Sequence, residues 1–203
     1  MTKVVEFWFD YGSASSHLAY WALKDIAGRT AAKIDLKPML LGAVFQATEN
    51  RSPLEVEAKG RWMILDLQNY AQRYGVTFRM NPHVIFNTMP LMRAALIALR
   101  RGELEPFSNS LFNAIWVDGL DMGDVDILWA TIGKDGFDVD VYKEGIQEQD
   151  IKDDLKRRSQ EAIDRGIFGA PTFFVGETMW WGQDRLEWVE AALTDDPATN
   201  PKN

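Results

Sequence analysis

The chain contains no cysteine among its 203 residues, and it has only two histidines, His17 and His83. The lack of cysteine excludes a disulfide bond, a thiolate metal site and a thiol nucleophile supplied by the protein itself. With so few imidazoles, we expect no metal site. A long uncharged apolar run is also missing, and the first residues lack the apolar region of a signal peptide. We therefore expect a soluble, cytoplasmic protein.

The chain also has fewer basic than acidic residues. The formal net charge is -8 at neutral pH, from 22 Lys and Arg against 30 Asp and Glu. Nucleic acids and anionic membrane surfaces are bound through basic fields, so neither is expected as a partner. A small-molecule site with local positive charge remains possible. The hydrophobic content of 46% is enough for one well-buried core, or for one domain that carries a large insertion.

The sequence pattern is typical of strands at the two ends of the chain and of helices in the middle. At the start, residues 4–9 predict a strand, 13–28 a helix and 32–39 a strand, which together form a parallel, right-handed β-α-β unit. The helices predicted in the middle cover residues 55–74, 88–101, 106–117, 125–133 and 150–166. A hairpin of strands at 171–175 and 178–181 and a helix at 185–193 close the chain.

This pattern predicts an α/β fold in which the two β-containing ends share one sheet. We assign residues 1–40 and 168–194 to that unit, residues 41–167 to an all-helical insertion, and residues 195–203 to a disordered tail.

Ser13 stands where the first predicted strand passes into the first predicted helix, after Asp10-Tyr11-Gly12. Such a corner favours a bound anion, because the first N–H groups of the helix and its dipole both point there. Serine is also a common N-cap residue that only accepts a backbone hydrogen bond. His17 follows one turn later, but nothing marks an acid to orient it, so a serine hydrolase is not predicted. The residues alone leave both roles of Ser13 open.

Two further segments carry unusual residues. In Gly169-Ala170-Pro171 a proline enters a predicted strand, which either a cis peptide bond or an ordinary trans proline at a sheet edge would explain. Asp184 and Arg185 stand at the start of the last predicted helix. They could hold the ammonium and carboxylate of an amino-acid-like group, or act as a helix cap and a solvated charge.

Four stretches, taken together, resemble the 2-hydroxychromene-2-carboxylate isomerases and their relatives, the kappa-class glutathione transferases. They are FWFDYGSASSHLAY, ENRSPLEVEAKGRWMILDLQNYAQRYG, GAPTFFVG and MWWGQDR, in the same order and over nearly the whole chain. The resemblance implies a thioredoxin-like domain with a DsbA-type helical insertion, and a homodimer. It also implies that serine replaces the reactive cysteine of the thioredoxin corner and that glutathione supplies the thiol.

The resemblance further implies a role for each matching residue. Ser13 would hydrogen-bond the glutathione sulfur, and Ala170, before a Pro171 that the family keeps cis, would bind the cysteinyl backbone. Asp184 and Arg185 match the pair that grips the γ-glutamyl end.

The insertion would contribute the remaining contacts. Asn50 and Lys59 match residues that reach glutathione, and Asn87 matches a position that lines the site. Trp62 and Trp116 are candidates for the walls of a pocket for a flat substrate. The family usually has proline where this chain has Ala14, and an aromatic pair more often than Ser15 and His17, and these departures bear on the substrate.

The function implied is a glutathione-dependent isomerase of aromatic catabolism. It would interconvert 2-hydroxychromene-2-carboxylate and trans-o-hydroxybenzylidenepyruvate through a glutathione thiolate activated by Ser13. Two alternatives stay open: a kappa-like transferase or peroxidase acting on other electrophiles, and a DsbA-like protein that binds a partner without catalysis. A disulfide oxidoreductase is excluded, because the chain has no cysteine.

Overall fold

The computed structural model describes residues 3–83 and 87–194 of the chain. The elements follow one another as β1 (Val4–Phe9), α1 (Ala14–Thr30), β2 (Lys33–Pro38), α2 (Leu41–Thr48), η1 (Pro53–Glu55), α3 (Glu57–Tyr74), α4 (Met89–Arg101), α5 (Leu104–Trp116), α6 (Val125–Lys134), α7 (Val139–Gly145), α8 (Gln149–Asp164), β3 (Thr172–Val175), β4 (Thr178–Trp181), η2 (Gln183–Arg185) and α9 (Leu186–Thr194). The tail that we predicted to be disordered, residues 195–203, lies outside the described residues.

A single mixed sheet joins the two ends of the chain, as predicted. Its strand order is β2-β1-β3-β4. β1 pairs in parallel with β2, and β3 pairs antiparallel with both β1 and β4, so the hairpin prediction is confirmed. In the centre, Phe7 is in register with Leu36 on one side and Phe173 on the other. The C-terminal end of β1 therefore lies between two neighbouring strands, and the turn that leads to Ser13 follows it directly.

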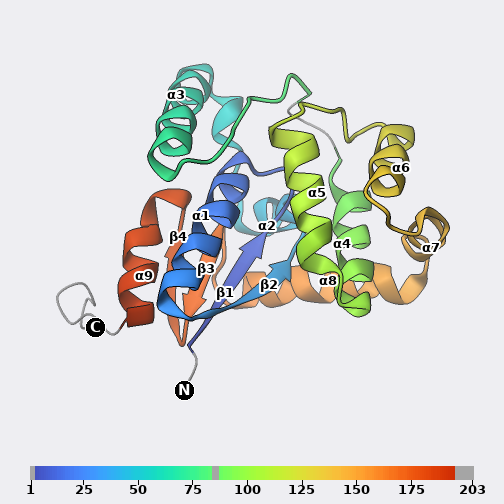
Figure 1. Ribbon diagram of the computed structural model, residues 1–203. Helices are drawn as coiled ribbons and strands as arrows, with labels where there is room; N and C mark the ends of the chain where they lie inside the picture. Colours follow the sequence, from blue (N-terminus) through green and yellow to red (C-terminus); the bar gives the residue numbers. More distant parts are fainter. Residues whose placement is uncertain (1–2, 84–86, 195–203) are drawn as a thin grey trace.

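The two faces of the sheet have separate cores, which follow from the period-two alternation of β1. Val5, Phe7 and Phe9 pack into the larger core with residues of α1, α4, α5 and α9. Trp8 points to the other face, into a smaller core formed with α2 and α8. Figure 1 shows α1 and α9 beside each other over the sheet, with α8 running across behind it.

Between β2 and β3, every element that the structure describes is helical, as the sequence pattern predicted. Several of these helices are not a separate body, because α4 and α5 bury their side chains in the same core as β1 and α1. The division into a domain of residues 1–40 and 168–194 and a helical insertion of residues 41–167 stays a prediction. No described helix is both long enough and apolar enough to cross a membrane.

Several helix ends depart from prediction by one or two residues, and two of the described α-helices were not predicted. α1 runs to Thr30 instead of ending near Gly28, and it closes on Ala31, whose φ of 52° is left-handed. α5 begins two residues before the predicted start. α2 and α7 were not predicted at all. α7 is short and has the alternating sequence VDVY, which resembles a strand, whereas α2 lacks a polar N-cap residue of its own.

Candidate functional site

Ser13 is the N-cap of α1 and makes two hydrogen bonds through its hydroxyl. The Oγ atom accepts from the Ser16 backbone N–H at 3.1 Å, which is the capping role that the sequence left open. The same Oγ donates to the carbonyl oxygen of Ala170 at 3.1 Å. The N–H groups of Ala14 and Ser15 have no hydrogen-bond acceptor among the described residues, as expected in the first turn of a helix. These two donors border a cavity.

The loop before β3 brings Ala170 beside Ser13. The Ala170–Pro171 peptide bond is cis, as the resemblance implied. The Pro171 carbonyl accepts from the Gly182 N–H at 3.0 Å, which joins this loop to the end of β4. Trp181 covers the loop so closely that a Cβ atom on Gly169 would lie 2.5 Å from the indole Nε1. Residue 169 must therefore be glycine for the indole to keep this position.

A cavity of about 650 Å³ opens above Ser13. Its lining is mostly apolar, and the side chains that contribute are Leu41, Phe45, Leu54, Met63, Leu67 and Met80. They come from α2, η1, α3 and the segment after α3, so the helical region supplies most of the wall opposite the sheet. A cavity of this size and character suits a small organic ligand.

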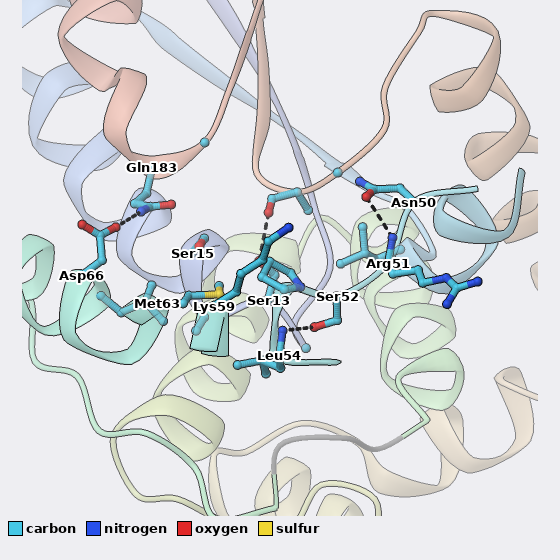
Figure 2. Close-up of a pocket in the computed structure, with 18 of the residues that line it drawn as sticks. Ser13, Ser15, Asn50, Arg51, Ser52, Leu54, Lys59, Met63, Asp66 and Gln183 are labelled. Carbon is cyan, nitrogen blue, oxygen red and sulfur yellow. Dashed lines mark hydrogen bonds between the residues drawn. The ribbon is translucent and has the colours of Figure 1, made fainter. Parts of the chain in front are cut away.

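Charged side chains of opposite sign occupy different parts of this cavity. Asp66 and Asp184 line one end, where the Gln183 Nε2 donates to an Asp66 carboxylate oxygen at 3.3 Å. Burial, and then the negative charge of Asp184, raise the pKa of Asp66. Figure 2 shows Asp66 and Gln183 on one side of Ser13 and Arg51 on the other.

The two cations of the cavity have no partner of opposite charge. Arg51 and Lys59 both line it, and neither has an ion pair within residues 3–83 and 87–194. Other arginines of the described residues, such as Arg29, Arg100 and Arg165, do form ion pairs with carboxylates. The unpaired charges make the part of the cavity near Arg51 and Lys59 locally positive, which the net charge of the chain does not reveal.

The sequence of the chain is similar to known proteins over nearly its whole length. A model of the DSBA-like thioredoxin domain matches residues 4–194. The chain belongs to the DSBA-like thioredoxin family. Among its relatives, a 2-hydroxychromene-2-carboxylate isomerase from Sphingobium xenophagum is 32% identical over 96% of this chain and 100% of the relative. Glutathione S-transferase kappa 2 from Caenorhabditis elegans is 27% identical over 95% and 92%.

The fold agrees with these relatives. A solved structure of a 2-hydroxychromene-2-carboxylate isomerase superposes with a TM-score of 0.86 over 95% of each chain, at 28% identity. The predicted resemblance and the predicted DsbA-type thioredoxin fold are therefore confirmed. These relatives of the DSBA-like chain are named as enzymes, an isomerase and a transferase, and this chain is an enzyme as well.

Most of the residues that the sequence singled out meet at the cavity of this DSBA-like chain. The residues that line it are Ser13, Asn50, Lys59, Trp62, Trp116, Ala170 and Asp184. Asn50 is already engaged, because its Nδ2 donates to the Phe168 carbonyl and its Oδ1 accepts from the Arg51 N–H, each at 2.8 Å. Asn50 thus holds the loop before Ala170. Trp62 is exposed, whereas Trp116 is buried and donates to the Tyr11 carbonyl at 2.8 Å.

Three predicted residues do not line the cavity. Pro171 lies behind Ala170, and Arg185 turns its guanidinium to Asp184 at 3.0 Å. Asn87 is exposed and its Oδ1 accepts from the Met89 N–H at 3.0 Å, at the start of α4. Because the structure places Asn87 outside the cavity, we leave it out of the proposed substrate pocket.

His17 is a core residue of the DSBA-like fold and faces away from the cavity. It is fully buried beside Phe78 and Phe112, with its Nε2 2.9 Å from the Thr77 carbonyl oxygen. Burial lowers the pKa of His17 to about 4. The imidazole is therefore neutral at physiological pH and donates from Nε2 to Thr77. It takes no part in the site.

Sequence reasoning missed several contributors to the site. Asp66 and Gln183 shape its acidic end, and Arg51 its basic end. Asp10 lies directly beneath the Ser13 turn, is 1% exposed and accepts three hydrogen bonds. The signal for Asp10 was present, since a charged residue directly after an apolar strand must find buried partners.

Proposed function

We propose that this chain is a glutathione-dependent isomerase that interconverts 2-hydroxychromene-2-carboxylate and trans-o-hydroxybenzylidenepyruvate. The observation that carries the proposal is the cavity above Ser13, which combines apolar walls with carboxylates at one end and unpaired cations elsewhere. The names of the relatives support the reaction class. The experiment below tests the glutathione dependence and the substrate.

The charges of the cavity fit glutathione in one orientation. The ammonium group of its γ-glutamyl end is complementary to Asp66 and Asp184, which line the same end of the cavity. A carboxylate of the peptide is complementary to Lys59, whose charge has no partner in the described part of the chain. Ala170 presents a carbonyl oxygen between these two ends, and a peptide N–H can donate to it.

Ser13 would hold the sulfur by hydrogen bonding and would not itself attack the substrate. A free thiol has a pKa of about 8.5, so only a few per cent is ionised at neutral pH. The Ser13 hydroxyl, the free N–H groups of Ala14 and Ser15 and the dipole of α1 all stabilise an anion at this position. Each unit by which they lower the thiol pKa corresponds to about 1.4 kcal/mol.

When bound with its sulfur at Ser13, glutathione would supply a nucleophilic thiolate for reversible addition to the conjugated system of the substrate. The protein would hold the substrate during this reaction. Leu54 and Met63 offer apolar surface to a flat ring, and Arg51 offers a cation to the substrate carboxylate. An acidic protein can thus bind an anionic substrate through local charge.

The test is a spectrophotometric assay of the chromene with purified protein at several glutathione concentrations. Turnover that requires glutathione and returns it unconsumed is the expected result. Conjugation of chlorodinitrobenzene without chromene isomerisation would instead select a kappa-like transferase. If glutathione does not bind at all, the chain is a binding protein without this catalysis.

A further inference from the structure

Beneath the Ser13 turn, one buried carboxylate joins three segments that are far apart in the sequence. Asp10 follows β1 directly and is 1% exposed. Its Oδ1 accepts from the Gly12 N–H at 2.9 Å. Its Oδ2 accepts from the Leu41 N–H and from the Thr88 hydroxyl, each at 2.9 Å. Leu41 begins α2, and Thr88 is the residue before α4.

The same residue closes the turn through its backbone. The Asp10 carbonyl accepts from the Ser13 N–H at 3.0 Å, so side chain and main chain both fix the four residues up to Ser13. The turn has little freedom on its outer side, because a Cβ atom on Gly12 would lie 2.6 Å from the Thr88 Cγ2. The position of Ser13 is therefore set by contacts with the helical region as well as by α1.

The cost of burying this carboxylate is large enough to require an explanation. Burial raises the pKa of Asp10, and the bonds from Gly12, Leu41 and Thr88 act in the opposite direction. A negative charge three residues before Ser13 also opposes formation of a thiolate there. An uncharged residue would suit the thiolate better if charge alone mattered. The geometry must then account for the presence of Asp10.

We propose that Asp10 is a positioning residue, which fixes the Ser13 turn against the starts of α2 and α4 so that the Ser13 hydroxyl and the first N–H groups of α1 converge on one point of the cavity. The role rests on the proposed function, since the group at that point is the sulfur of glutathione. α2 supplies Leu41 and Phe45 to the cavity wall, so the same carboxylate also sets the distance between that wall and Ser13.

Asp10→Asn tests this role because it preserves the shape and removes one acceptor. In either orientation, the amide nitrogen of asparagine faces a backbone N–H, of Gly12 or of Leu41, which then lacks its partner. Ser159→Ala is the matched control. The Ser159 Oγ accepts from the Leu40 N–H at 3.0 Å, so its loss disturbs the start of α2 without touching the Ser13 turn.

The first readout is the pKa of the bound glutathione thiol, followed by thiolate absorbance. In wild type we expect this pKa to lie below that of free glutathione. Asp10→Asn should raise it by about one unit, a tenfold decrease in the acid dissociation constant of the thiol, and Ser159→Ala should leave it unchanged. Removing a charge without moving Ser13 would lower this pKa instead. A lowered or unchanged value in Asp10→Asn would therefore overturn the proposal.

The second readout needs no glutathione and separates this inference from the proposed function. In the ligand-free protein, exchange of the Ser13 and Ser16 amide hydrogens should be faster in Asp10→Asn than in Ser159→Ala at equal global stability. Equal exchange in the two variants would overturn the positioning role even if glutathione binds. If Asp10→Asn does not fold, Thr88→Val removes a single donor, and the same changes are expected at smaller size.

Discussion

The Ser13 hydroxyl donates its hydrogen to the carbonyl oxygen of Ala170 at 3.1 Å. The two residues proposed to hold the sulfur and the peptide of glutathione are thus bonded to each other. A serine hydroxyl has one hydrogen, so it cannot donate to sulfur and to Ala170 at once. A ligand N–H that donates to the Ala170 carbonyl would replace the hydrogen bond from Ser13. The Ser13 hydroxyl could then donate its hydrogen to the sulfur.

This coupling predicts that the site discriminates among thiols by their peptide N–H. Glutathione and other thiols with a cysteinyl amide N–H should have a lowered pKa when bound. For 2-mercaptoethanol at saturation the pKa should be lowered less, because nothing replaces Ser13 at Ala170 and only the helix N–H groups and dipole remain to stabilise the thiolate. Ultraviolet titration of each thiol with the protein measures this. Equal lowering of the pKa for both kinds of thiol would contradict the coupling.

Arg51 should decide affinity for the carboxylate of the substrate. In Arg51→Met we expect the KM for the chromene to rise about tenfold, since a charge-assisted hydrogen bond contributes about 1.5–3 kcal/mol. The KM for chlorodinitrobenzene, which has no carboxylate, should not change. Arg61→Met is the control, because Arg61 pairs with Glu57 on the exposed surface of α3 and does not line the cavity. Equal effects on both substrates would exclude this role of Arg51.

Glutathione affinity should depend on pH through Asp66. Its pKa is raised by burial and by Asp184, so it takes up a proton at higher pH than an ordinary aspartate. Only the ionised carboxylate attracts the ammonium group, and the Kd should therefore increase as the pH falls from neutral toward that pKa.

The variant Asp66→Asn should weaken glutathione binding about tenfold at neutral pH and flatten this pH dependence. Calorimetric titration at several pH values measures both effects. Asp153→Asn, on the distant helix α8, is the control and should bind as wild type. A pH dependence that survives in Asp66→Asn would show that another group is responsible.

His17 should make the fold acid-sensitive. Its pKa is about 4 in the folded chain against 6.5 in the unfolded chain. Between these values the unfolded state binds a proton that the folded state does not, so the free energy of unfolding falls as the pH drops from about 6.5 to about 4. The loss attributable to His17 is at most about 3 kcal/mol.

Denaturant unfolding across this pH range measures the effect. His17→Gln keeps a donor for the Thr77 carbonyl but does not titrate, so its stability should fall less steeply. His83→Gln, which replaces a half-exposed histidine, is the control for a histidine substitution outside the core. If His17→Gln shows the same slope as wild type, another group causes the acid sensitivity.

The sheet and the longer helices could be predicted because their signals are local. β1 is apolar and ends at a turn, and the helices α3, α4 and α8 have periodic apolar faces. α2 could not be predicted, because it lacks a side-chain cap of its own. Its first free N–H groups are satisfied by Asp10 and Ser159, which lie far away in the sequence.

Some residues of the candidate site could likewise be predicted from local sequence, and others could not. Ser13, Ala170 and Asp184 stand in short motifs, so the resemblance identified them, and the cavity brings them together. Asp66 stands within a helical pattern in which an exposed acid is ordinary. Its significance depends on Asp184, which approaches it only in the folded chain. The interaction between Asp66 and Asp184 depends on the folded structure, so it cannot be predicted from either segment of the sequence alone.

The most direct test of the account is the titration of bound glutathione against pH in wild type and in Ser13→Ala. The account predicts that wild-type protein binds glutathione and lowers its thiol pKa well below the free value, and that Ser13→Ala still binds but loses most of this shift. Absence of binding in wild type, or an equal shift in Ser13→Ala, would contradict it. Ser13 would then be only the N-cap of α1.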